Sequence, residues 1–148
     1  MPAALRSLLL FALVLGLLGT EAELLLLGHF EDAWQLVPIV LIGIAITSLV
    51  VYGVSRTRRA VRAVQVTMLL FVVAGVLGTW LHYQSNAQFE LEIAPEMLFW
   101  PLFKAAMAGS MPVLAPGAMI QLGLIGLSWS FRHPALVRTH SSSSPQHP

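Results

Sequence analysis

Residues 80–92 read WLHYQSNAQFELE, a polar stretch that stands between two long apolar segments. A shorter polar stretch, GHFED, occupies residues 28–32. Together with Glu21, Glu23 and Glu96, these two stretches contain all seven acidic residues of the chain. Charged side chains are costly in the hydrocarbon core of a membrane. We therefore expect apolar helices that deliver both polar stretches to one side of a bilayer.

The composition is typical of a membrane protein. Of the 148 residues, 57% are hydrophobic and 10% are charged, whereas soluble domains contain about 25% charged residues. The length suits one domain, and a formal net charge of +1 gives no reason to expect nucleic acid as a partner. Because the sequence contains no cysteine, disulfides, thiolate metal ligands and cysteine nucleophiles are excluded.

Four apolar segments have the length of membrane-spanning helices, which take roughly 20 residues each. These segments are residues 3–27, 36–54, 64–82 and 113–131. A fifth segment, 95–109, is too short to span and rich in aromatic residues, which predicts an interfacial helix before the fourth span, broken at Pro101. We predict an all-α integral membrane protein with a single four-helix transmembrane domain over residues 1–138. The tail, 139–148, lacks apolar residues and is predicted to be disordered.

The first apolar segment also has the features of a signal peptide. Arg6 precedes the apolar run, and residues 20–22 (Thr-Glu-Ala) form an acceptable cleavage site. Cleavage there would leave a mature chain that begins with Glu23 and four unprotected leucines. We therefore expect residues 1–22 to be retained as part of a spanning helix.

The basic residues predict the orientation in the membrane. Lys104 lies on one side of the predicted spans, and all other basic residues lie on the opposite side: Arg6, Arg56, Arg58, Arg59, Arg62, Arg132 and Arg138. Basic residues are retained in the cytoplasm. This distribution predicts that both termini are cytoplasmic and that the polar stretches face outward. A bacterial inner (plasma) membrane is the expected location for so compact a chain.

Small residues recur four positions apart within each predicted span, which predicts close packing of the helices. They are Ala12/Gly16/Thr20, Gly43/Thr47, Gly75/Thr79 and Gly126/Ser130. The sequence also contains an internal echo, because GLLGT at 16–20 matches GVLGT at 75–79, and FE at 30–31 matches FE at 89–90 with the same offset. The echo suggests two helical hairpins repeated in the same orientation.

The polar stretches hold the residues with metal-binding potential. Imidazoles and carboxylates bind Zn, Mn, Fe or Cu, and two histidines with one or two carboxylates would fill a zinc shell. The candidate ligands are His29, Glu31, Asp32, His82, Glu90 and Glu92. Their spacing follows no known ligand signature, and the alternative is a solvated outer loop that its acidic residues keep soluble. The sequence does not identify a cofactor.

The sequence leaves several functions open. It has no Gly-x-Ser-x-Gly, no His-Glu-x-x-His and no glycine-rich phosphate loop, so an enzyme is the less favoured interpretation. The leading hypothesis is a non-catalytic subunit or accessory of a membrane assembly, in contact with lipid and with a membrane-protein partner or further copies of itself. The alternative is an outward-facing metal- or small-ligand-binding protein or enzyme that uses His29 and His82 with nearby carboxylates. A small transporter is a third hypothesis. The polar residues within the spans, such as Thr47 and Gln121, are neutral and would not form a proton relay through the bundle.

Overall fold

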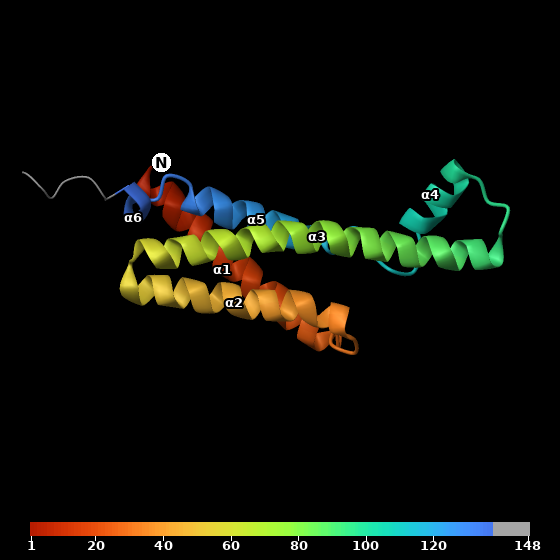
Figure 1. Cartoon of the computed structure of the whole chain (residues 1–148), viewed down its shortest axis with the longest axis horizontal. Coiled ribbons are helices and arrows are strands. Elements are labelled where there is room, and N and C mark those ends of the chain that lie inside the picture. Colours follow the sequence, from red (N-terminus) through yellow and green to blue (C-terminus); the bar gives the residue numbers. More distant parts are fainter. Residues whose placement is uncertain (138–148) are drawn as a thin grey trace, which may run out of the picture.

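The protein is a helical bundle from which one long helix projects. The computed structural model describes residues 1–137, and all regular elements within them are helices; the predicted disordered tail, 139–148, lies outside the described residues. The helices are α1 (Ala3–Leu26), α2 (Ala33–Ser55), α3 (Arg58–Ile93), α4 (Phe99–Met107), α5 (Gly117–Ser130) and α6 (Pro134–Val137). α1, α2, α3 and α5 pack together, whereas α4 lies against the projecting end of α3 (Figure 1).

Three helices, α1, α2 and α3, are long and apolar enough to cross a membrane. α5 is apolar but has only 14 residues, a length of about 21 Å against a hydrocarbon core of about 30 Å. Within the predicted span 113–131, residues 113–116 form turns instead of helix, because Pro116 has no N–H and restricts the residue before it. These three helices are compatible with an integral membrane protein, and the predicted count of four spans is not confirmed.

α3 is longer than predicted. It has 36 residues, about 54 Å, and contains both the predicted span 64–82 and the polar stretch 80–92, which we expected to be a loop. Thr57 caps its start by accepting the N–H of Ala60 at 3.3 Å. No glycine or proline occurs between Gly78 and Pro95, and the helix ends at Ile93, two residues before that proline. The polarity of the stretch changes the surface of the helix without ending it.

α3 and α5 pack closely, because glycines allow their backbones to approach each other. A Cβ atom at Gly75 would lie 2.9 Å from both the backbone N of Ile120 and the carbonyl O of Pro116. A Cβ atom at Gly123 would lie 2.7 Å from the carbonyl O of Met68. These neighbours are backbone atoms that cannot turn aside, so a larger residue would push the two helices apart.

The predicted small-residue packing is confirmed at three of its glycines and wrong at one. Gly75 packs against α5, Gly16 of α1 faces Leu122, and Gly126 faces Met68. Gly43, in contrast, has no atom within 4 Å of the position that a Cβ would occupy. The spacing of small residues therefore identified helix contacts in α1, α3 and α5, but not in α2.

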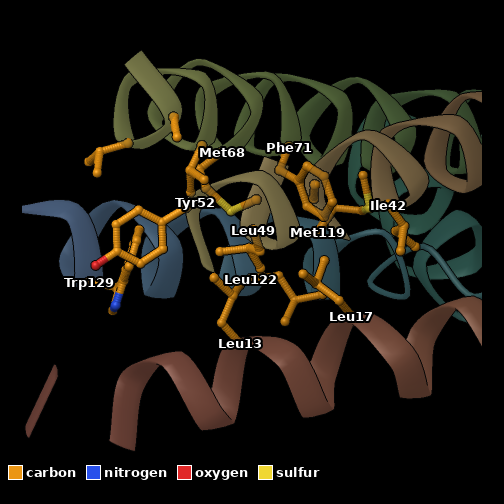
Figure 2. Close-up of a cluster of buried hydrophobic side chains, with 14 residues drawn as sticks. Leu13, Leu17, Ile42, Leu49, Tyr52, Met68, Phe71, Met119, Leu122 and Trp129 are labelled. Atoms are coloured by element: carbon orange, nitrogen blue, oxygen red, sulfur yellow. The ribbon is translucent and has the colours of Figure 1, made fainter. Parts of the chain in front are cut away.

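Large side chains from four helices fill the centre of the bundle (Figure 2). All of them are at least nine-tenths buried: Leu13 and Leu17 of α1, Ile42, Leu49 and Tyr52 of α2, Met68 and Phe71 of α3, and Met119, Leu122 and Trp129 of α5. Lipid tails are as apolar as these side chains, so association in a membrane depends on close packing and not on escape from water. The fit of large side chains beside glycines supplies that packing.

The predicted repeat of two hairpins is not confirmed by the packing. Gly16 and Gly75 occupy equivalent positions in the sequence echo, and both pack against α5. In two equivalent hairpins, each glycine would face the second helix of its own hairpin, which is α2 for Gly16. The two copies of the echo therefore have different surroundings.

The arginines and the carboxylates lie at opposite ends of the bundle, and Lys104 of α4 is at the end of the carboxylates. The start of α1, the α2–α3 connection and the end of α5 lie together (Figure 1), and they carry Arg6, Arg56, Arg58, Arg59, Arg62 and Arg132. We call this the arginine end; Arg138 lies outside the described residues. The α1–α2 connection and the end of α3 lie toward the other end, the acidic end. Which side of the membrane each end faces stays a prediction.

Candidate functional site

The six predicted metal ligands lie at the acidic end in three separate places. His29, Glu31 and Asp32 are in the α1–α2 connection, His82 is within α3, and Glu90 and Glu92 are in the last turn of α3. The end of α3 extends well past the α1–α2 connection (Figure 1). Within residues 1–137, no group of three or more His, Cys, Asp or Glu side chains is arranged to hold a metal ion. The metal site stays a prediction that this arrangement does not support.

Asp32 has a structural role at the start of α2. Its Oδ1 accepts the backbone N–H groups of Trp34 at 2.7 Å and Gln35 at 3.0 Å, which caps the helix. The side-chain oxygen of Gln35 accepts the N–H of Glu31 at 2.8 Å, a reciprocal arrangement similar to a capping box. One of the predicted ligand oxygens is therefore already bound to backbone.

His82 connects α3 to the loop before α5. Its Nδ1 lies 3.1 Å from the carbonyl O of Pro112. A carbonyl oxygen can only accept, so Nδ1 carries the proton and donates it; in the neutral ring this leaves the lone pair on Nε2. The contact fixes the orientation of the imidazole and holds the loop against α3.

Asn86 is the most fully bonded polar side chain at this end, although nothing in the sequence singled it out. It is 4% exposed. Its Nδ2 donates to the carbonyl oxygens of Ala106 at 2.9 Å and Met111 at 2.8 Å, and its Oδ1 accepts the N–H of Met111 at 3.1 Å. A buried amide needs such partners, so Asn86 fastens the end of α4 and the following loop to α3.

Gly109 lies directly on the side chain of Asn86. A Cβ atom there would lie 2.5 Å from Cγ of Asn86 and 2.7 Å from its Nδ2, so a residue without a side chain is required for the loop to lie on the amide. The sequence signal was a lone asparagine in the stretch 80–92 and a glycine in the next loop. Only the fold shows that the two residues meet.

α4 packs against α3 through aromatic side chains. The ring centroids of Tyr83 and Phe103 are 6.0 Å apart, and Trp100 stacks on Phe103 at 5.4 Å. The Nζ atom of Lys104 lies 5.5 Å from the centroid of Trp100, within the range of a cation–π interaction. The predicted break at Pro101 is wrong, because this proline lies in the first turn of α4, where its missing N–H costs little.

The end of α3 and the start of α4 together form a projecting tip, which we define as residues 89–100. Large apolar side chains are exposed on it: Phe89, Ile93, Leu98, Phe99 and Trp100. Leu98 is 77% exposed and Phe99 is 79% exposed. Three carboxylates, Glu90, Glu92 and Glu96, share the tip, and the stretch 89–100 contains no basic residue.

The chain matches no protein-family model, no curated protein and no solved structure. The geometry of the two ends is therefore the basis on which a function is inferred.

Proposed function

We propose that this chain is a small, non-catalytic subunit of a larger membrane assembly and that it binds a partner protein through the tip. The observation that carries this proposal is the exposure of Leu98 and Phe99 at the apex of a helical projection. Large apolar side chains gathered on an exposed surface are typical of protein-binding sites.

The position of the tip supports a protein partner in preference to lipid. α1 and α2 are themselves long enough to span, and their connection carries Glu31 and Asp32, which supports a membrane position with the edge of the hydrocarbon near that connection. α3 is about 54 Å long, whereas the hydrocarbon core is about 30 Å thick. The part of α3 beyond the connection therefore lies outside the hydrocarbon, and the apolar side chains of the tip need a cover other than lipid tails.

The charge of the tip indicates the chemistry of the partner. Three carboxylates share the tip with the apolar side chains, and one lysine, Lys104, lies over Trp100 at its edge, so the net charge here is negative and the matching surface is apolar with a surplus of lysine or arginine at its rim. A second copy of this chain, joined tip to tip, would bring the carboxylates of both copies together, and such like-charge contacts are unfavourable. A different membrane protein is therefore the occupant that we propose.

The polar side chains near the tip support a structural role for this end. Asp32 caps α2, His82 bonds to the carbonyl of Pro112, and Asn86 bonds to the loop after α4. The bonds of His82 and Asn86 hold α4 and its loop in place and so present the tip as a preformed surface. Preformed surfaces bind with a smaller loss of conformational entropy.

Native mass spectrometry of the protein purified from its own membranes in mild detergent tests this proposal. We expect a stoichiometric complex with a second protein that has an apolar, basic-rimmed outer surface. The double variant Leu98→Ala/Phe99→Ala should weaken this complex by roughly tenfold or more, because both side chains would be anchors of the interface.

The matched control is Leu8→Ala/Phe11→Ala, which removes the same two side chains from an exposed, apolar face of α1. This control should leave the complex intact. The proposal is overturned if the wild-type chain is recovered only alone or only with copies of itself, or if the control weakens the complex as much as the tip variant does.

A further inference from the structure

A hollow of about 540 Å³ opens at the arginine end of the bundle. Three basic and three polar residues line it: Arg6, Arg58, Arg56, Tyr52, Thr57 and His133. They come from α1, α2, the α2–α3 connection, the start of α3 and the turn after α5. All these segments end at the same level of the bundle (Figure 1), so the hollow lies where spanning helices leave the hydrocarbon. The tip is at the opposite end, so a site in the hollow is independent of the proposed function.

Arg6 has a buried donor that lacks an acceptor. Its Nη2 reaches from α1 to the end of α5, where it donates to the carbonyl O of Arg132 at 3.3 Å. Its Nε is buried and has no hydrogen-bond partner among residues 1–137. Buried N–H groups without partners are rare in folded proteins. The guanidinium lines the hollow, and its one hydrogen bond within residues 1–137 is to the carbonyl of Arg132, so its outer donors are available to an anion there.

Arg56 occupies a backbone position that favours glycine. It forms the C-cap of α2 with φ of 52°, in the left-handed region, which helix ends commonly fill with glycine. The side chain lies along the wall of the hollow, with Cζ 5.2 Å from the ring centroid of Tyr52 and Nη1 3.5 Å from its Oη. Arg56 thus combines a left-handed backbone conformation with a guanidinium on the wall of the hollow.

Tyr52 and His133 form a neutral, hydrogen-bonded wall. Nδ1 of His133 accepts the N–H of Ala135 at 3.2 Å, so the proton of the neutral ring is on Nε2, which lies 3.1 Å from Oη of Tyr52 and donates to it. Burial, together with the charges of Arg6 and Arg56, lowers the pKa of His133. Since Oη accepts from His133, its own hydrogen is available to an acceptor in the hollow.

The electrostatic surroundings of the hollow favour an anion. The starts of α1 and α3 lie at this end and carry partial positive charge, which the partial negative charge at the ends of α2 and α5 offsets, so the arginine side chains decide the sign of the potential. The acidic residues lie in 21–32 and 90–96, toward the far ends of α1, α2 and α3 (Figure 1). The three arginines are therefore neutralised by no carboxylate at this end of the described chain.

We propose that this hollow binds a phosphate group, the chemistry that an anionic phospholipid headgroup and free phosphate share. Guanidinium groups match the oxygens of phosphate in geometry and charge. Basic pockets between helices at the membrane surface suit the headgroups of anionic lipids, and the level of this hollow in the bundle places it within reach of a headgroup.

Binding of phosphatidylglycerol, compared with zwitterionic phosphatidylcholine, tests the proposal by native mass spectrometry of the full chain. Arg6→Gln and Arg56→Gly should each weaken phosphatidylglycerol binding by roughly fivefold. The matched control is Arg62→Gln, an exposed arginine of α3 at the same end that does not line the hollow. It should change binding by less than about twofold, because surrounding salt screens exposed charges.

Inorganic phosphate distinguishes the two sources. If millimolar phosphate raises the Tm of the lipid-free protein and competes with phosphatidylglycerol, the site takes free phosphate as well; if phosphatidylglycerol binds and phosphate has no effect, the lipid is the ligand. Equal binding of the two lipids with no effect of phosphate, or equal losses in Arg62→Gln and Arg6→Gln, overturns the proposal.

Arg56→Gly separates binding from folding. Glycine adopts the left-handed conformation without steric cost, so this variant should retain the Tm of the wild type while it loses phosphatidylglycerol. The variant remains decisive even if Arg6→Gln fails to fold. Wild-type lipid binding in folded Arg56→Gly would contradict the assignment of Arg56 to the site.

Discussion

The two halves of α3 are held by different physical means. From Ala60 to Thr79 the helix packs between α2 and α5, and glycines bring its backbone against that of α5. Beyond Trp80 it contacts α4 and the following loop, through a buried amide and a row of aromatic rings. In lipid, close packing is what holds helices together. In the projecting half, packed aromatic rings and satisfied hydrogen bonds can stabilise the contact.

The largest expected effect is in the packed half. Gly75→Leu would force a side chain into the backbone N of Ile120 and the carbonyl O of Pro116. We expect a loss of about 3 kcal/mol in the free energy of unfolding, because overpacking against backbone cannot be relieved by a rotamer change. Unfolding by a denaturing detergent, followed by circular dichroism, measures this loss.

Gly43→Leu is the matched control on α2. Nothing lies within 4 Å of the position of its Cβ, so the added leucine would point into lipid and should change stability by less than about 0.5 kcal/mol. Equal losses in both variants would contradict the assignment of the close contact to α3 and α5.

A smaller and more local effect is expected in the projecting half. Asn86→Ala removes three hydrogen bonds and leaves backbone groups of Ala106 and Met111 without their partner. We expect a loss of about 1–3 kcal/mol, confined to the α4–α5 loop. Hydrogen exchange should show faster exchange at Met111 and its neighbours, with the protection of the packed half unchanged.

Gln88→Ala serves as the control for this variant, because Gln88 is exposed on the same helix. It should leave exchange in the loop as it is in the wild type. If Asn86→Ala instead lowers the protection of α3 from Ala60 to Thr79, the two halves are not separately stabilised.

The smallest expected effect is a pH dependence of stability at the arginine end, where α3 begins and His133 is buried. His133 faces Arg6, Arg56 and Tyr52, and burial with the two arginine charges lowers its pKa from 6.5. The unfolded chain therefore binds a proton more readily than the folded chain, and stability should fall as the pH drops below about 6.5. The amide of Asn86 does not titrate, so its contacts contribute no such dependence.

Thermal unfolding of the wild type and of His133→Gln between about pH 7.5 and about pH 5.5, a range that brackets the ordinary pKa of histidine, measures this response. We expect the Tm of the wild type to fall more steeply with acid than that of the variant. Equal slopes would show that His133 does not sense pH in the folded protein.

Much of the fold could be predicted because lipid constrains a sequence strongly. A bilayer accepts helices of about 20 apolar residues, and the helices α1, α2 and α3 follow from this rule, whereas the orientation predicted from the basic residues stays a prediction. The length rule locates the end of apolar sequence, not the end of a helix. α3 therefore continued past His82, and the usable signal was the absence of glycine and proline between Gly78 and Pro95.

The sites were less predictable, because chemistry at a site depends on which residues meet. The sequence shows that His29 and His82 are able to bind metal, but it does not show whether the fold brings their two segments together. In the sequence, the positions of the arginines were explained by the predicted membrane orientation. The sequence did not indicate that Arg6 donates to the carbonyl of Arg132, 126 positions further along the chain. Asn86 and Gly109 form no recognisable motif in the sequence. Their structural role becomes visible only from their contact in the fold.

The uninterrupted length of α3 has a mechanical consequence. A helix without an internal proline transmits tilt as a rod does, and this rod joins the tip to the hollow at the arginine end. Over about 54 Å, a tilt of about 5° displaces one end relative to the other by about 5 Å. A partner that tilts α3 when it binds the tip would therefore also displace the start of α3 at the hollow.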